Sequence, residues 1–318
     1  MTAAPTNAAP AGPVPWFVLV NPASGRGRAG RRIDEARRLF VRHGLPAEFA
    51  LTRARGHAVD LTVSALRSGH RRIAAMGGDG TLNEVVNGLL GQSEVPVAQV
   101  ALAALPVGTG NDWARSLGMP RALADAVAAL ASRSPVRCDA GRLVFTDADG
   151  AERRRFFANV AGAGFDALVL ERLGDRKAGA WAYTGELLRS MRRFEAPTLT
   201  LRDGARESAR SSLVVFCNLG RYCGGGMQVA PAADLRDGRL DVTWIEAMTG
   251  RQILWELRRL FDGTLGGSRH VTQWATPTLA IASDRPTGVE VDGELVGRTP
   301  ARVEVLPGAL SVIAPALG

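Results

Sequence analysis

The feature that most constrains the fold is a regular alternation of short apolar runs and amphipathic runs in the first half of the chain. Strands are predicted at 16–20, 47–52, 71–76 and 100–106. Helices are predicted at 31–43, 58–68, 81–90, 111–117 and 121–131. Repeated β–α units of this length require a parallel sheet with helices on its faces.

The second half has a different texture. Asp-Gly pairs occur at 149–150, 203–204, 237–238 and 292–293, each beside alternating apolar residues. Asp-Gly between such runs is a strong signal for a hairpin turn. The sequence therefore predicts mostly antiparallel β-structure, interrupted by helices near 179–193 and 251–261.

These patterns divide the chain into two domains after a short tail. Residues 1–15, rich in Ala and Pro, are predicted to be disordered. Residues 16–136 are expected to form an α/β domain with a parallel sheet and flanking helices. Residues 137–318 are expected to form a mostly antiparallel β-sandwich, with the last residues packing back on the first domain. The chain of 318 residues is 46% hydrophobic and 22% charged, which suits two globular domains.

Several classes of protein are excluded by what the chain lacks. Three cysteines without close pairing argue against a disulfide framework and favour a reducing cytoplasm. The four histidines are scattered, so no zinc motif is present. No apolar window reaches the ~18 residues of a spanning helix, and the start lacks the pattern of a signal peptide.

The charge is strongly basic. The net charge is +8, and nine Arg stand against three acids between Trp16 and His57. Such a balance fits a nucleic acid, an anionic membrane or a phosphorylated substrate, and equally a solvated helix face. Nucleic acid is not expected, because no basic motif interleaved with aromatic residues is present.

A glycine pattern near the N-terminus raises the question of a dinucleotide. Gly25, Gly27 and Gly30 form G-x-G-x-x-G between a predicted strand and a predicted helix, and Glu48 follows near the distance of a ribose-binding acid. This dehydrogenase interpretation leaves two later glycine-rich motifs unexplained. A Walker phosphate loop is excluded, since no G-x-x-x-x-G-K-[ST] occurs.

The first of those motifs is Gly77-Gly78-Asp79-Gly80-Thr81, between a buried strand and a helix. Glycines allow a ligand to approach the backbone, and a helix N-terminus suits a phosphate. A carboxylate beside a phosphate is reasonable when a divalent cation lies between them. The alternative is an ordinary turn in which Asp79 or Thr81 caps the helix.

The second motif, Gly108-Thr109-Gly110-Asn111-Asp112, repeats this arrangement. It too follows a predicted strand and precedes a predicted helix, although Asn111 or Asp112 could act only as a helix cap. Because both turns lie at the carboxyl ends of parallel strands, we expect them to face one crevice.

Together these residues resemble the diacylglycerol kinase catalytic family, which includes bacterial lipid kinases and sphingosine kinases. The resemblance extends from Phe17 to about Pro315. It also includes Asn21-Pro22-x-Ser24-Gly25 and the segments FANVAGAGFDALV (157–169), CNLGRYCGGGMQVAPAADLRDGRLDV (217–242) and VEVDGELV (289–296). In this interpretation the glycines after Gly25 are incidental to a basic turn.

The resemblance implies that ATP binds between the two domains. The matching nucleotide positions are Asn21, Pro22, Ser24, Gly25, Thr52, Gly77, Gly78, Asp79, Gly80, Thr81, Asn83, Gly108 and Thr109. Asp79 and Asp112 match acids that organise the catalytic Mg²⁺. Glu294 matches the general base that accepts the proton of the lipid hydroxyl, and Lys177 matches a basic residue that faces phosphate.

A second Mg²⁺ is implied by the loop from Ala233 to Leu240, which resembles a structural metal loop of some bacterial members. The matching ligand positions are Asp234, Asp237 and Arg239. Arg239 fits such a site only through its backbone carbonyl.

The implied function is an ATP- and Mg-dependent lipid kinase of the cytoplasm, associated peripherally with an anionic membrane. Diacylglycerol is the expected acceptor; a sphingoid base, a prenyl alcohol or another glycerolipid stays open. A NAD kinase or a non-catalytic relative that binds nucleotide or lipid is an alternative. The helix at 251–261 is either interfacial or, as we favour, core-packed with an Arg-rich outer face. A homodimer is the default.

Overall fold

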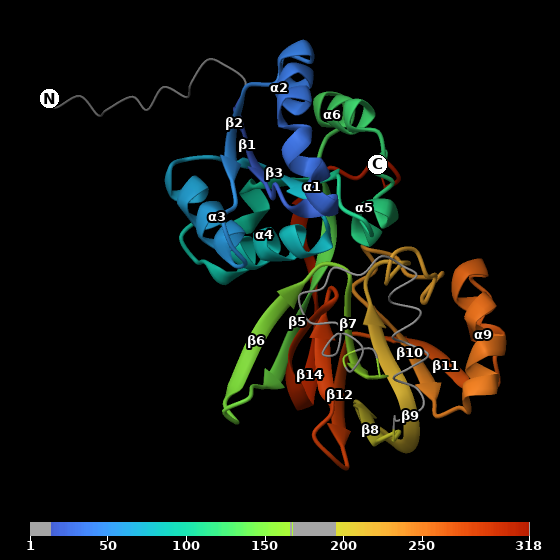
Figure 1. Cartoon of the computed structure of the whole chain (residues 1–318). Coiled ribbons are helices and arrows are strands. Elements are labelled where there is room, and N and C mark those ends of the chain that lie inside the picture. The colour runs from blue at the N-terminus through green and yellow to red at the C-terminus, as the bar shows by residue number, and fades with distance from the viewer. Residues whose placement is uncertain (1–13, 166, 168–194, 318) are drawn as a thin grey trace, which may run out of the picture.

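The computed structural model describes residues 14–165, 167 and 195–317. It has an α/β part and a β-rich part (Figure 1). The predicted tail, apart from Val14 and Pro15, lies outside the described residues. The predicted helix at 179–193 lies outside them as well, and so does Lys177.

The α/β part contains the parallel sheet that the alternation predicts. Its strands are β1 (Trp16–Val20), β2 (Ala47–Leu51), β3 (Arg72–Gly77) and β4 (Ala101–Pro106), in the order β4-β3-β1-β2. All three pairings are parallel. Around it lie α2 (Ile33–Arg42), α3 (His57–Arg67), α4 (Asp79–Gly91), α5 (Asp112–Ser116) and α6 (Leu123–Ser132). β1, β3 and β4 are apolar and buried because helices cover this sheet.

The glycines after Gly25, namely Gly27 and Gly30, are not incidental, so this expectation is wrong. The chain winds into α1 (Ser24–Arg31), in which Gly25, Arg26 and Gly27 all have positive φ. Gly30 packs so closely on the first turn that a Cβ there would lie 3.1 Å from the carbonyl oxygen of Pro22. The glycine pattern therefore shapes a tight turn after β1.

The second half is antiparallel, as predicted. Its strands are β5 (Val136–Thr146), β6 (Glu152–Phe157), β7 (Val160–Gly164), β8 (Thr198–Asp203), β9 (Arg206–Asn218), β10 (Leu240–Glu246), β11 (Val271–Thr276), β12 (Thr278–Ser283), β13 (Gly288–Val291) and β14 (Glu294–Val312). Hydrogen bonding closes a ring in the order β7-β9-β8-β12-β14-β13. The ring closes because β9 and β14 each pair with different strands along their length.

The Asp-Gly pairs form three of the four predicted hairpin turns, namely β5–β6, β8–β9 and β13–β14. The prediction at 237–238 is wrong, because a long connection from 219 to 239 joins β9 to β10. There the amide of Arg239 donates to Asp237 Oδ1 at 2.9 Å, and that of Gly238 donates to Asp139 Oδ2 at 2.7 Å. This Asp-Gly pair shapes a loop held by β5.

The predicted helix at 251–261 is confirmed as α9 (Gly250–Asp262). Thr249 and Gln252 form a capping box at its N-terminus, and Gly263 ends it in the left-handed conformation. Ile253 and Leu260 on its inner face pack on a small core that includes Phe165 and Phe216. Among the helices that the structure describes, none is long and apolar enough to cross a bilayer.

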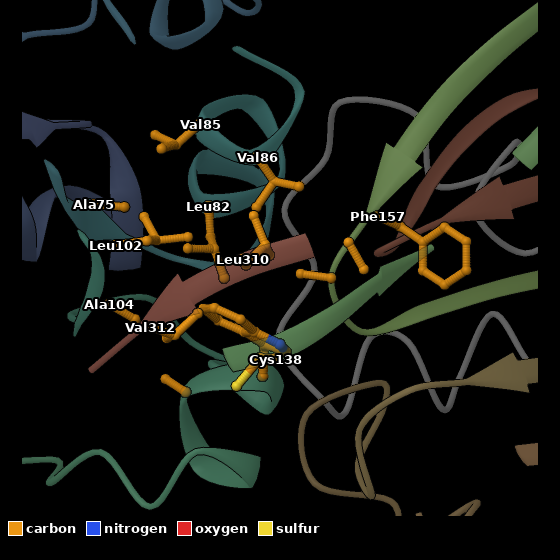
Figure 2. Packing of buried hydrophobic residues seen from close by; sticks show 14 of the residues in the cluster. Ala75, Leu82, Val85, Val86, Leu102, Ala104, Cys138, Phe157, Leu310 and Val312 are labelled. Carbon is orange, nitrogen blue, oxygen red and sulfur yellow. The ribbon is translucent and has the colours of Figure 1, made fainter. Parts of the chain in front are cut away.

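The end of the chain joins the first sheet. Ser311 and Val312 of β14 pair in parallel with Ala101 and Leu102 of β4. In Figure 2, Leu310 and Val312 cluster with Leu82 of α4 and Cys138 of β5. Since one sheet and one core run through both parts, the domain limits 16–136 and 137–318 stay a prediction.

Candidate active site

The two glycine-rich turns lie against each other, as expected from the carboxyl ends of β3 and β4. The amide of Gly108 donates to the carbonyl of Gly77 at 2.9 Å. A Cβ at Gly108 would lie 2.4 Å from Gly78 Cα, and a Cβ at Gly77 would lie 2.5 Å from Thr81 Oγ1. Gly108 is therefore required by the close approach of the Gly78 backbone, and Gly77 by the close approach of the Thr81 side chain.

The turn after β1 joins the same place. Asn21 Nδ2 donates to Thr81 Oγ1 at 3.1 Å, and Arg28 Nη2 donates to the carbonyl of Gly108 at 3.0 Å. No side chain caps the N-terminus of α4, where Gly78 is the N-cap residue. Backbone N–H groups at a helix start bind anions such as phosphate. The three turns thus surround a site suited to phosphates.

Two acids face each other at this site. A Cβ at Gly110 would lie 2.9 Å from Asp79 Oδ2 and 3.6 Å from Asp112 Oδ2. Asp112 Oδ2 accepts a 2.7 Å hydrogen bond from the amide of Gly225, in the loop between β9 and β10. Asp112 Oδ1 is buried and has no hydrogen-bond partner among the described residues; Arg115 Nη1 lies 3.9 Å away.

The protonation of both acids is perturbed. Burial, together with the charges of Asp112 and Asp292, raises the pKa of Asp79 to about 7. Burial also raises the pKa of Asp112. A buried carboxylate with an orphaned oxygen, beside a partly buried one, fits a hard divalent cation such as Mg²⁺. Among the described residues, no group of three Asp, Glu, His or Cys side chains is placed to hold a metal ion by itself, so other ligands would be water or phosphate oxygens.

A hairpin turn from the β-rich part is fixed to this site through Asp292. Its φ is 47° and that of Gly293 is 82°. The carboxylate of Asp292 accepts hydrogen bonds from Asn83 Nδ2 at 2.8 Å and from three consecutive amides where β6 leads into β7, namely Ala158 (3.2 Å), Asn159 (3.2 Å) and Val160 (2.9 Å). Burial nevertheless raises the pKa of Asp292.

This turn places Glu294 beside the N-terminus of α4. A Cβ at Gly80 would lie 3.6 Å from Glu294 Oε1. Glu294 Oε2 lies 3.0 Å from Arg55 Nη2 and 3.3 Å from Arg155 Nη2. The three acids expected to work together therefore lie around the first turn of α4, although they come from widely separated parts of the sequence.

Asn83 contacts protein groups through both of its amide atoms. Its Oδ1 accepts from Arg155 Nη2 at 2.8 Å, and its Nδ2 donates to Asp292 and to the carbonyl of Phe156. The sequence analysis did not find Arg55, Arg155 or Asp292. Only Asp292 carried a signal, its Asp-Gly pair, which was assigned to a turn alone. The contact of Asn83 with ATP stays a prediction.

The remaining predicted nucleotide positions lie at the ends of the strands. The amide of Thr52 follows β2 and donates to the carbonyl of Val20 at 2.8 Å. Thr109 is exposed in its turn, and Ser24 is buried next to Gly78. Lys177 lies outside the described residues, so its role stays a prediction.

The predicted structural metal loop contains a group of acids. Asp234 Oδ1 accepts from the amide of Arg236 at 3.0 Å, while Asp237 Oδ1 accepts from that of Arg239. Burial raises the pKa of Asp237 and, together with the charges of Asp237 and Asp234, raises that of Asp241 to about 6. Metal binding by Asp234, Asp237 and Arg239 stays a prediction.

Family models match both parts of the chain. Residues 15–143 match the diacylglycerol kinase catalytic domain, and residues 159–314 match the YegS C-terminal NAD kinase beta sandwich-like domain. A Stenotrophomonas maltophilia protein named probable lipid kinase YegS-like is 30% identical over 305 residues, 95% of this chain and 96% of its own length. A Mycobacterium tuberculosis protein named diacylglycerol kinase is 29% identical over 308 residues, 94% of this chain and 95% of its own.

Solved structures share the fold. One described as a putative diacylglycerol kinase from Bacillus anthracis superposes with a TM-score of 0.78 at 22% identity, covering 98% of this chain and 99% of that one. Another from the same organism gives 0.75 at 24% identity, covering 96% and 99%. The two-part architecture described above is therefore shared over whole chains.

Proposed function

Since the chain belongs to the family of YegS-like lipid kinases and is a kinase, we propose that it transfers the γ-phosphate of ATP to a lipid hydroxyl, with diacylglycerol as acceptor and Mg²⁺ as metal. The observation that carries this proposal is the convergence of Asp79, Asp112 and Glu294 around the N-terminus of α4. Phosphoryl transfer requires positioned phosphates, neutralised charge and an oriented hydroxyl.

The glycine turns hold the nucleotide. In this proposal the triphosphate lies over the N-terminus of α4, where backbone N–H groups are uncapped. Asn21, Ser24 and Gly25 approach it from the first turn, and Gly108 and Thr109 from the next strand. Glycine at 108 lets its turn pack on Gly78 closely enough for the two turns to form one surface.

Asp79 and Asp112 hold the metal. Bound Mg²⁺ would neutralise charge on the phosphate oxygens. The unpartnered Oδ1 of Asp112 supports this assignment, because a buried acceptor without a donor is costly unless a ligand completes it. Gly225 and Trp113, which donate backbone hydrogen bonds to Asp112 and Asp79, hold the two carboxylates in place.

Glu294 accepts the proton of the attacking hydroxyl at Oε1, the oxygen nearer Gly80. Arg55 and Arg155 hold Oε2, which orients the carboxylate toward the start of α4. The lipid hydroxyl would therefore approach from the side of the β13–β14 turn. We also expect the enzyme to act in the cytoplasm at the surface of an anionic membrane, where such an acceptor resides.

The experiment that tests this proposal is phosphate transfer from radiolabelled ATP to a total lipid extract, with Mg²⁺ or with EDTA. We expect a labelled lipid that migrates with phosphatidic acid, and no label with EDTA or with Asp112→Asn. A different labelled lipid would replace diacylglycerol as acceptor. ATP binding without any labelled lipid would favour a non-catalytic relative, and binding of NAD alone would favour a dehydrogenase.

A further inference from the structure

The outer face of α9 is unusual for a helix in contact with water. Arg251, Trp255 and Arg258 follow one another at helical spacing, with Phe261 at the edge of the same face. We call these four residues the α9 face. The opposite side of the helix already packs on the protein, since Ile253 is buried and Leu260 packs on the same core.

Two large aromatic side chains on this face are open to solvent. Trp255 is 84% exposed and Phe261 is 61% exposed. In the described part of the chain these are the exposed aromatic residues, and both belong to α9. Trp is favoured where an apolar ring meets a polar boundary, as at the surface of a bilayer.

Arginines surround these aromatic rings. Arg251 and Arg258 lie on the face, and Arg259 and Arg269 line a hollow of about 470 Å³ that also contacts Trp255. Arg258 pairs with Asp262 at 3.6 Å and Arg259 with Glu256 at 3.1 Å. Arg251 and Arg269 have no ion pair with any described acid. The surface is therefore complementary to anions.

The α9 face is connected to the active site by one loop. The amide of Gln228 donates to the carbonyl of Leu260 at 2.5 Å, and its side chain donates to the carbonyl of Phe261 at 3.2 Å. Three residues earlier in the same loop, Gly225 donates to Asp112. The C-terminal end of α9 thus lies beside the segment that contacts the catalytic acid.

We propose that the α9 face docks the enzyme on an anionic bilayer. Trp255 and Phe261 insert at the level of the headgroups, and Arg251, Arg258 and Arg269 contact lipid phosphates. An amphipathic surface with arginines and exposed Trp is the composition that binds such an interface. This inference rests on the proposed function, because a lipid acceptor is the reason for the enzyme to dock on a bilayer. Vesicle binding itself requires no catalysis.

The test is sedimentation of the full chain with vesicles, without ATP. We compare phosphatidylcholine vesicles with vesicles that also contain phosphatidylglycerol. Wild type should bind only the anionic vesicles. Arg251→Gln with Arg258→Gln, and separately Trp255→Ala with Phe261→Ala, should each weaken binding on the order of tenfold or more. Trp255→Phe should retain most of the binding.

A matched control lies on α2, which also has an arginine-rich outer side. Arg38 is exposed there, and Val41 is 79% exposed. Arg38→Gln with Val41→Ala removes one exposed charge and one exposed apolar side chain from a surface outside α9. We expect less than a twofold effect. A loss equal to that of the α9 variants would mean that binding is not specific to α9, which overturns the assignment.

Two further outcomes would overturn the proposal. Displacement from vesicles by micromolar glycerol 3-phosphate would make the hollow a site for free phosphate. The second outcome is that wild type does not bind vesicles but self-associates in sedimentation velocity, and that Trp255→Ala with Phe261→Ala abolishes this self-association. It would assign the face to a second copy of this chain. Kinase activity on detergent-dispersed lipid, measured in parallel, separates a failure of docking from a failure of the proposed function.

Discussion

Asp79 and Asp112 face each other across Gly110, and the space between their carboxylates exists because Gly110 has no side chain. A Cβ there would lie 2.9 Å from one Oδ2 atom and 3.6 Å from the other. The acids come from the ends of two neighbouring strands, so the sheet brings them together, and the glycine leaves both carboxylates in place beside it.

Gly110→Ala should lower kcat at least about tenfold, because the methyl group displaces the carboxylate of Asp79 from the position in which it would hold Mg²⁺. The overall fold should be retained, since Gly110 is not among the residues with positive φ. Steady-state kinetics and circular dichroism measure the two effects. Gly91→Ala, at the other end of α4 with open space around its Cβ, is the matched control. Full activity in Gly110→Ala would contradict this geometry.

The stability of the ligand-free enzyme should fall as the pH rises from about 4 to 7. The pKa of Asp79 is raised in the folded state from 3.8 to about 7, so the folded protein binds a proton that the unfolded chain has released. The free energy of unfolding then decreases through this window and stays lower above it.

Asp79→Asn should remove this contribution and stabilise the ligand-free protein by roughly 1–3 kcal/mol at pH 8, while abolishing activity. Thermal melts of both proteins from pH 4 to 8 measure the difference. If the melting temperatures of the two proteins differ by the same amount at every pH, Asp79 is not the group responsible for the pH dependence. Mg²⁺ with ATP should raise the melting temperature of wild type more than that of the variant.

Glu294→Gln should lower kcat by a factor of about 10² to 10⁴ with little change in ATP affinity, because the amide cannot accept the proton of the hydroxyl. Glu304→Gln is a close control on the same strand. The Glu304 side chain is 19% exposed against 20% for Glu294, and Glu304 also pairs with an arginine, Arg142. Equal losses of activity in both variants would indicate a structural effect of β14.

Asp292→Asn should act through Glu294, which lies two residues further along the chain. The substitution places an amide among four N–H donors, so we expect a loss of stability of about 1–3 kcal/mol. The turn carrying Glu294 should then be less well held, lowering kcat more than it raises KM for ATP. If the folded Asp292→Asn variant, saturated with ATP and lipid, has the wild-type kcat, Asp292 has no positioning role.

Much of the fold could be predicted because its signals are local. The alternation of apolar and amphipathic runs predicted β1 to β4 and their helices, and Asp-Gly pairs predicted three hairpins. The hairpin predicted from the pair at 237–238 is wrong. Asp-Gly also occurs in loops held by a residue far away in the sequence, here Asp139. The ring through β9 and β14 could not be foreseen, because long strands exchange partners only in the folded sheet.

For the active site, the sequence by itself determined which chemical groups are available: glycine turns after parallel strands, an acid in each, and a late glutamate. Only the tertiary structure decided that Gly110 lies between two of those acids and that Asp292 fixes the turn carrying Glu294. It also decided that Arg55, just before α3, and Arg155 of β6 orient the Glu294 carboxylate. The physical reason is range. Turn chemistry depends on neighbours in the chain, whereas the position of a carboxylate depends on hydrogen bonds and charges that arrive from strands more than a hundred residues away.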